Sequence, residues 1–180
     1  MIKFTALLIG SVSCITAFAE VTHVEDSGFV SEHVLQLQGS PDQVYRALTA
    51  DIHHWWNAEH SYSGQADNFS LEAKAGGCFC EKLPNGGSVE HMRVSFAEPG
   101  KHLRLLGGLG PLQEMAVTGS MDFQLQTTAS GNTQLHYRYV VGGYVPGGLR
   151  TIATAVDQVQ LGQLQRLQKY LATGNPVDTK

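Results

Sequence analysis

The C-terminal stretch, residues 149–172, constrains the fold most, because it is the one long segment of this sequence with helical periodicity. Its apolar residues recur three or four positions apart, with a single step of five near Gly162. The apolar series is Ile152, Val156, Val159, Leu164, Leu167 and Leu171. This pattern predicts an amphipathic helix of about two dozen residues. The sequence Gly-Asn-Pro at 174–176 is expected to end it.

Most segments between residues 28 and 142 alternate instead, as strands do. In "GFVSEHVLQLQ", Phe29, His33, Leu35 and Leu37 share one face. Six further segments read as strands: "NFSLEAKA", "CFCEKL", "SVEHMRVSF", "KHLRLL", "MAVTGSMDFQLQ" and "TQLHYRYVV". Two short helices interrupt the series after the first strand. "SPDQVYRAL" begins with a capping-box pattern at Ser40 and Gln43, and "DIHHWW" follows.

This order of elements predicts an α+β domain. A single curved antiparallel sheet has an apolar face that must be covered, and the C-terminal helix is the segment long enough to cover it. A sheet that curves around a helix leaves a cavity between them, which suits an apolar small molecule.

The first 19 residues resemble a secretory signal peptide. Lys3 is followed by the apolar stretch "FTALLIGSVSCI", which is too short to span a bilayer, and by "AFA" at 17–19. We therefore expect cleavage between Ala19 and Glu20 and a periplasmic or secreted protein without stable membrane insertion. A retained N-terminal anchor, or a lipid on Cys14, would be the alternatives.

The charge of the mature chain argues against a nucleic-acid partner. Without Lys3, the chain has 11 basic and 16 acidic side chains, which gives a net charge of −5, and no basic run is present. The glycine-rich "GGYVPGG" at 142–148 lacks the Lys and Ser/Thr of a phosphate-binding loop, and no Gly-x-Ser-x-Gly motif of esterases occurs. No cofactor is expected, and the sequence specifies neither the ligand nor an oligomeric state.

The order of several local motifs resembles the SRPBCC superfamily, which includes START-related and polyketide-cyclase-like proteins with the helix-grip fold. The matching pieces are "SPDQVYRALT" followed by "WW", "AGGCFCE", "VSFAEPGKHLRL" and "VDQVQLGQLQRLQKYL". "HSYSG" followed by "GGCFCE" is similar to a secreted bacterial subgroup. The resemblance covers residues 28–172, with 20–27 as an extension and 173–180 as a tail. It implies a hydrophobic ligand cavity, but no single activity.

The hairpin around "PNGG" at 84–87 carries the side chains best suited to acid–base, metal or redox chemistry. If Leu83 faces Ser88, Cys80 faces His91, Glu81 faces Glu90, and Cys78 faces Arg93. Phe79, Glu81, Leu83, Glu90, Met92, Val94 and Phe96 would then face the cavity, with Cys78, Cys80 and His91 on the outside. Two opposed carboxylates in a cavity would raise one pKa, so Glu81 and Glu90 are candidate acid–base residues; at the rim of the sheet they would be structural.

The two cysteines of this hairpin allow three interpretations. Cys78, Cys80 and His91, with or without His60 from a loop, have the ligand chemistry of zinc, although Cys-x-Cys is not the usual spacing. A Cys78–Cys80 disulfide would need a bulge to shorten their separation. Two reduced, half-buried thiols are the third interpretation.

The expected function is therefore binding of a hydrophobic or amphipathic small molecule between the sheet and the C-terminal helix. The apolar surface would come from Trp55, Trp56, Phe79, Met92, Phe123, Tyr137 and Tyr139. The ligand would be oriented by His60, Tyr62, Glu81 and Glu90. The alternative is a cofactor-free cyclase- or hydrolase-like enzyme that uses Glu81, Glu90 or His91 as acid and base. A partner-binding role, as in the ATPase-activator branch of the superfamily, fits an exported chain less well.

Overall fold

The computed structural model describes residues 20–177, so the predicted signal peptide lies outside the described residues. Its strands and main helices follow the predicted order. They are β1 (Glu20–Glu25), β2 (Gly28–Leu37), α1 (Pro41–Thr49), α2 (Ile52–Trp55), β3 (Phe69–Leu71), β4 (Cys78–Lys82), β5 (Ser88–Glu98), β6 (His102–Leu106), β7 (Thr118–Thr127), β8 (Thr133–Gly142) and α3 (Arg150–Thr173).

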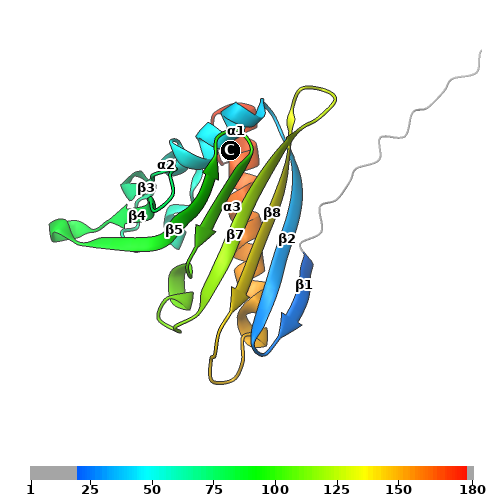
Figure 1. Ribbon diagram of the computed structural model, residues 1–180. Helices are drawn as coiled ribbons and strands as arrows, with labels where there is room; N and C mark the ends of the chain where they lie inside the picture. Colours follow the sequence, from blue (N-terminus) through cyan, green and yellow to red (C-terminus); the bar gives the residue numbers. More distant parts are fainter. Residues whose placement is uncertain (1–19, 178–180) are drawn as a thin grey trace, which may run out of the picture.

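The eight strands form one antiparallel sheet in the order β1-β2-β8-β7-β6-β5-β4-β3. Figure 1 shows α3 lying along one face of the curved sheet, behind β7, β8 and β2, with α1 and α2 near one end. The fold is therefore the predicted α+β helix-grip arrangement. The β4–β5 hairpin projects beyond the part of the sheet that α3 covers.

The elements that frame the sheet form where local chemistry favours them. Ser40 accepts a hydrogen bond from the Gln43 amide while the Gln43 side chain caps the Ser40 amide, which confirms the predicted capping box at the start of α1. Gly174 ends α3 in a left-handed conformation, with φ 75°, that glycine adopts without steric cost. The edge strand β1, in the segment expected to be an extension, pairs with β2.

The inner face of the sheet carries the core, as alternation predicts. Leu135, Tyr137, Tyr139 and Val141 of β8 are all at most 2% exposed. Their neighbours on β7 are Met121, Phe123 and Leu125, which are also buried. Burial of these large side chains is the main stabilising contribution to the sheet–helix interface.

The stripe of α3 that faces the sheet differs from the predicted one. Ala153, Asp157, Gln160, Leu164 and Leu167 are buried and repeat at steps of four and three without a slip, and Gln163 is buried beside them. Three of these six residues are polar, so a search for apolar periodicity passed over them. The predicted inner residues Ile152, Val156 and Val159 are instead only half-buried, on the adjacent flank of the helix.

Buried polar contacts explain this rotation of α3. Asp157 accepts a hydrogen bond from the Ser31 hydroxyl at 2.5 Å and contacts His33 Nε2 at 3.0 Å. The Tyr137 hydroxyl donates to Oε1 of Gln160 at 2.9 Å. These contacts satisfy polar groups that would otherwise be costly to bury, and they anchor the N-terminal half of α3 to β2 and β8.

The register of the β4–β5 hairpin is partly different from the predicted one. Cys78 pairs with Arg93, as expected, but Cys80 pairs with Glu90 and Glu81 with Val89. The turn is one residue longer than expected, since the Leu83 amide bonds the Gly87 carbonyl and Lys82 faces Ser88. A bulge opposite the Phe79–Cys80 step absorbs the extra residue, His91.

The bulge reverses the orientation of two candidate site residues. His91 and Met92 are both buried, whereas Glu90 is exposed on the outer face. A second irregularity between Val94 and Phe96 turns Phe96 outward, where it is 42% exposed. The predicted inward positions of Glu90 and Phe96 and the outward position of His91 are therefore wrong.

No helix within residues 20–177 is long and apolar enough to cross a membrane.

Candidate functional site

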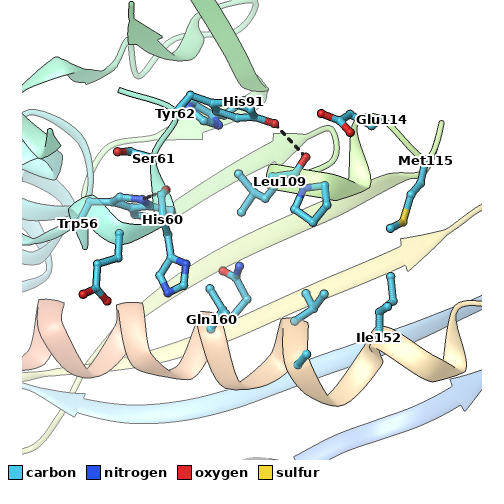
Figure 2. A pocket seen from close by; sticks show the side chains of 16 residues that line it. Trp56, His60, Ser61, Tyr62, His91, Leu109, Glu114, Met115, Ile152 and Gln160 are labelled. Carbon is cyan, nitrogen blue, oxygen red and sulfur yellow. Dashed lines mark hydrogen bonds between the residues drawn. The ribbon is translucent and has the colours of Figure 1, made fainter. Parts of the chain in front are cut away.

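A pocket of about 510 Å³ opens between α3, the 107–116 loop and the segment that follows α2 (Figure 2). We call it the α3 pocket. Its lining residues are Trp56, Glu59, His60, Ser61, Tyr62, His91, Leu109, Gly110, Pro111, Glu114, Met115, Ile152, Ala155, Val156, Val159 and Gln160.

The apolar walls of the α3 pocket come from both sides. The half-buried flank of α3 contributes Ile152, Val156 and Val159, and the facing loop contributes Leu109 and Met115. The apolar residues that were expected to fill the sheet–helix interface thus line a space that the protein leaves open. An incompletely covered apolar surface of this size is typical of a ligand site.

The loop segments on the far side of the pocket are held by specific hydrogen bonds. The Tyr62 hydroxyl donates to the Gly110 carbonyl at 3.3 Å, which links the two segments to each other opposite α3 (Figure 2). The Leu109 amide donates to the Tyr139 hydroxyl at 3.4 Å, and the Trp56 indole donates to the His60 carbonyl at 3.1 Å.

Glu81 and His91 form a buried hydrogen bond at this wall. Oε2 of Glu81 lies 2.9 Å from Nε2 of His91, and the two side chains are 0% and 4% exposed. Glu81 also accepts the Tyr62 amide at 3.1 Å and the Ser63 amide at 2.5 Å. The carboxylate therefore fixes both the His91 ring and the loop that carries Tyr62.

Burial raises the pKa of Glu81, but hydrogen bonds from Ser63, the Tyr62 amide and His91 outweigh it and bring the pKa below the ordinary 4.5. Burial lowers the pKa of His91 below 6.5, against the opposing effect of Glu81. At neutral pH the pair is thus a carboxylate and a neutral imidazole.

The structure brings four predicted site residues to this wall. Trp56, His60 and Tyr62 line the α3 pocket, as does the catalytic candidate His91. Glu81 lies behind His91 rather than in the lining. The other predicted apolar and aromatic residues are buried in the core outside the lining: Trp55, Phe79, Met92, Phe123, Tyr137 and Tyr139.

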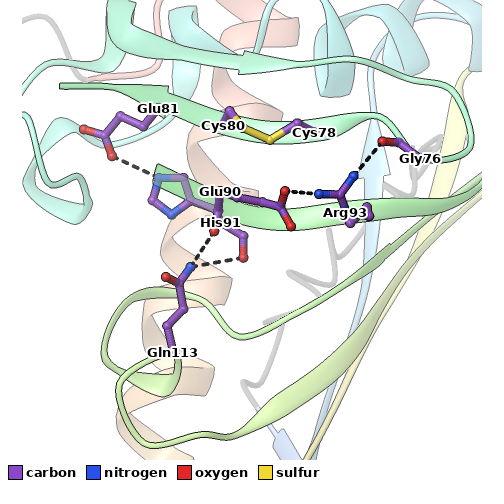
Figure 3. The surroundings of a disulfide bond; sticks show 8 residues. All are labelled: Gly76, Cys78, Cys80, Glu81, Glu90, His91, Arg93 and Gln113. Carbon is purple, nitrogen blue, oxygen red and sulfur yellow. Dashed lines mark hydrogen bonds and ion pairs between the residues drawn. A yellow bond between two sulfur atoms is a disulfide. The ribbon is translucent and has the colours of Figure 1, made fainter. Parts of the chain in front are cut away.

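Glu90 and the two cysteines lie on the outer face of the hairpin (Figure 3). Glu90 forms an ion pair with Arg93, and Cys78 is joined to Cys80 by a disulfide with the Cα atoms 5.3 Å apart. Within residues 20–177 no three His, Cys, Asp or Glu side chains are grouped so as to hold a metal ion. The zinc set of Cys78, Cys80 and His91 is not assembled, because the cysteines and the His91 ring face opposite sides of the sheet.

Several lining residues were not predicted. Gln160 and Val159 were expected only as helix positions, and Leu109 and Pro111 lie in a loop with no recognisable motif. Met115 was predicted to begin a strand, but β7 starts at Thr118 and Met115 lies in the preceding loop. The 3–4 repeat that contains Asp157 and Gln160 was the signal that could have placed Val156 and Val159 at the flank.

No protein-family model matches the chain, and no curated protein matches it significantly. Among solved structures, a conserved protein of unknown function from Enterococcus faecalis, EF2215, has a TM-score of 0.62 at 16% identity, over 92% of this chain and 84% of that one. DynU16, encoded in the dynemicin biosynthetic locus, has a TM-score of 0.55 at 19% identity, over 82% and 48%. Ara h 8.0201 has a TM-score of 0.55 at 13% identity, over 80% and 97%.

These solved structures share the overall fold of this chain. At such low identity they carry the fold alone, and function has to be argued from the site.

Proposed function

We propose that this protein binds a hydrophobic or amphipathic small molecule in the α3 pocket. The observation that carries the proposal is the pocket itself: about 510 Å³ of space lined mainly by apolar side chains and bounded by the flank of α3. This volume suits a small organic ligand. The signal-like N-terminus supports a periplasmic or secreted carrier of the subgroup that the hairpin motif resembles.

A pocket-filling variant tests this function. Val156→Trp places an indole in the α3 pocket, whereas Thr154→Trp adds the same indole to an exposed position of the same helix. With the neutral fluorophore N-phenyl-1-naphthylamine as probe, we expect Val156→Trp to weaken binding at least about ten-fold and Thr154→Trp to leave it unchanged. Failure of the wild-type protein to bind the probe, or equal binding by both variants, would refute the proposal.

One observation favours the enzymatic alternative. A neutral imidazole held by a carboxylate, at the wall of an apolar pocket, is the arrangement of a general base. If His91 has this role, the protein should exchange the α-protons of a bound ketone such as 2-tetralone for deuterium in D₂O. The exchange should be followed by NMR and should be lost in His91→Phe; background exchange in the wild type would exclude this role.

A further inference from the structure

Two buried side chains in the lining of the α3 pocket each keep one hydrogen-bonding group free, and the two groups are of opposite kind. His91 on β5 is 5% exposed and Gln160 on α3 is 4% exposed. Figure 2 shows Gln160 on the helix side and His91 beside Tyr62 on the facing side.

The free group of His91 is a hydrogen-bond acceptor. An ionised Glu81 carboxylate only accepts hydrogen bonds, so Nε2 of His91 must be the nitrogen that carries the proton toward it. In a neutral imidazole the other nitrogen, Nδ1, then carries a lone pair. No residue among those described donates a hydrogen bond to it.

The free group of Gln160 is a donor. Its Oε1 accepts the Tyr137 hydroxyl at 2.9 Å, which leaves the two protons of Nε2. Within the described chain no acceptor contacts them.

Both nitrogens remain accessible from the pocket. The polar side-chain atoms of residues 20–177 that are fully enclosed and also lack a partner are the Tyr45 hydroxyl and Nε2 of Gln163. His91 Nδ1 and Gln160 Nε2 are not among them, and both residues line the α3 pocket. Buried polar groups normally have partners, so a free acceptor and a free donor in one apolar pocket point to a ligand that supplies both.

The charges around the pocket restrict the ligand further. Glu59 and Glu114 are exposed lining residues, and the lining includes neither Lys nor Arg. A carboxylate, sulfate or phosphate ligand would meet two like charges and no cation to balance it.

We propose that the natural ligand is a neutral, largely apolar molecule with a phenolic or enolic hydroxyl that donates to His91 Nδ1 and a carbonyl that accepts from Gln160 Nε2. This inference rests on the proposed function and specifies its ligand class. A site built to hydrogen-bond both groups should discriminate against analogues that lack either one, since a buried group would then lose its partner.

Three matched probes test the inference: 4-hydroxybenzophenone, 4-methoxybenzophenone, which lacks the donor, and 4-benzylphenol, which lacks the carbonyl. Titration calorimetry with the wild-type chain should show the first binding about five- to ten-fold more tightly than either analogue. If all three bind equally, the pocket takes apolar ligands but the inference is wrong. If none binds, both the inference and the proposed function fail.

Variants assign each preference to its residue. His91→Phe should abolish the preference for hydroxyl over methoxy and keep the preference for carbonyl over methylene. Gln160→Leu should do the reverse, and His23→Phe, at an exposed position on β1, should keep both. Retention of the hydroxyl preference in His91→Phe would overturn the assignment. Because Gln160→Leu leaves the Tyr137 hydroxyl without its partner, the wild-type probe series decides the result if that variant is unstable.

Ultraviolet irradiation of bound 4-hydroxybenzophenone gives an independent readout of orientation. The excited carbonyl oxygen should take a hydrogen atom from a C–H bond of an α3 side chain close to Gln160, and the two carbon radicals should then combine into a cross-link that peptide mass spectrometry identifies. A cross-link to β5 beside His91 would contradict the proposed orientation.

Discussion

At the scale of single residues, the account depends most on the Glu81–His91 contact. The buried Glu81 carboxylate accepts hydrogen bonds from His91 and from the Tyr62 and Ser63 amides, which offset the cost of burying its charge. The groups placed against the His91 ring are Glu81, which is charged, and the uncharged rings of Tyr62, Phe69 and Phe79.

This contact predicts that acid destabilises the protein. The lowered pKa of Glu81 gives stability that is complete above about 4.5 and is lost as the pH falls through its folded-state pKa. The lowered pKa of His91 acts in the same direction: its contribution is complete above about 6.5 and is lost below it, as the unfolded state takes up a proton first. Urea unfolding between pH 7 and pH 4 should show a falling midpoint.

The double variant Glu81→Gln/His91→Phe should show a shallower fall over the same range, and His23→Phe should match the wild type. An equally steep fall in the double variant would show that other groups cause the acid sensitivity.

A glycine before β4 gives a second prediction at this scale. A Cβ on Gly77 would lie 1.9 Å from the Glu72 carbonyl oxygen and 2.8 Å from that of Lys74, so the loop entering the hairpin tolerates no side chain there. Gly77→Ala should lower the free energy of unfolding by about 2 kcal/mol or more. In Gly162→Ala, whose Cβ would meet nothing within 4 Å in the middle of α3, stability should rise by about 0.5–1 kcal/mol. Denaturant titration of the two variants checks both signs, and a stable Gly77→Ala protein would argue against this loop geometry.

At the scale of elements, the disulfide shortens β4 at the place where the bulge adds a residue to β5. The three residues Cys78 to Cys80 pair with the four residues Glu90 to Arg93, and a Cα separation of 5.3 Å is shorter than the roughly 6.5–7 Å of a regular strand. The contracted β4 thus lies beside the extra residue of β5. That extra residue is His91, which the bulge turns toward Glu81.

Loss of the disulfide should therefore affect the α3 pocket as well as stability. In Cys78→Ser/Cys80→Ser, closure of a very short loop is lost, which corresponds to about 1.5 kcal/mol of unfolding free energy. We expect the NMR resonances of the His91 ring to shift and 4-hydroxybenzophenone affinity to fall several-fold. Unchanged His91 resonances would mean that the bulge does not depend on the disulfide.

The hairpin also shows why the fold was more predictable than the site. Regular periodicity extends over ten residues in β2, β7 and β8, so their inner faces followed from alternation. A bulge adds one residue without a local sequence signal, and this bulge places the side chains of Glu90 and His91 on the faces of the sheet opposite to those predicted. The same limit applies to α3, where Asp157 and Gln160 occupy buried positions that only their tertiary partners Ser31, His33 and Tyr137 explain.

At the scale of the whole molecule, the helix-grip fold fixes the sheet but leaves the flank of α3 open. Leu164 and Leu167 seal the C-terminal half of the helix against the core, while Ile152, Val156 and Val159 in the N-terminal half face the pocket. The 107–116 loop and the Tyr62 segment form the facing wall and are joined by the Tyr62–Gly110 hydrogen bond. The ligand site is thus built by loops on a rigid scaffold.

The proposed export of the protein belongs to this scale too. Expression of the full chain in its own host should yield a mature protein whose N-terminal residue is Glu20. Signal peptidase recognises a small-x-small pattern, here Ala17 and Ala19, and cuts after its second small residue. Intact-mass measurement of the purified protein checks this cleavage. It also detects the decrease of about 2 Da that accompanies formation of the disulfide. A protein that retains residues 1–19 would rule out the proposed cleavage.

The central claim, that a small molecule occupies the α3 pocket, is tested most directly by NMR of the methyl-labelled protein with 4-hydroxybenzophenone. We predict intermolecular nuclear Overhauser effects from the probe to the methyl groups of Ile152, Val156, Val159 and Met115, and none to Val34 on the outer face of the sheet. Effects that appear only at outer-face methyl groups, or none at saturating probe, would contradict the account.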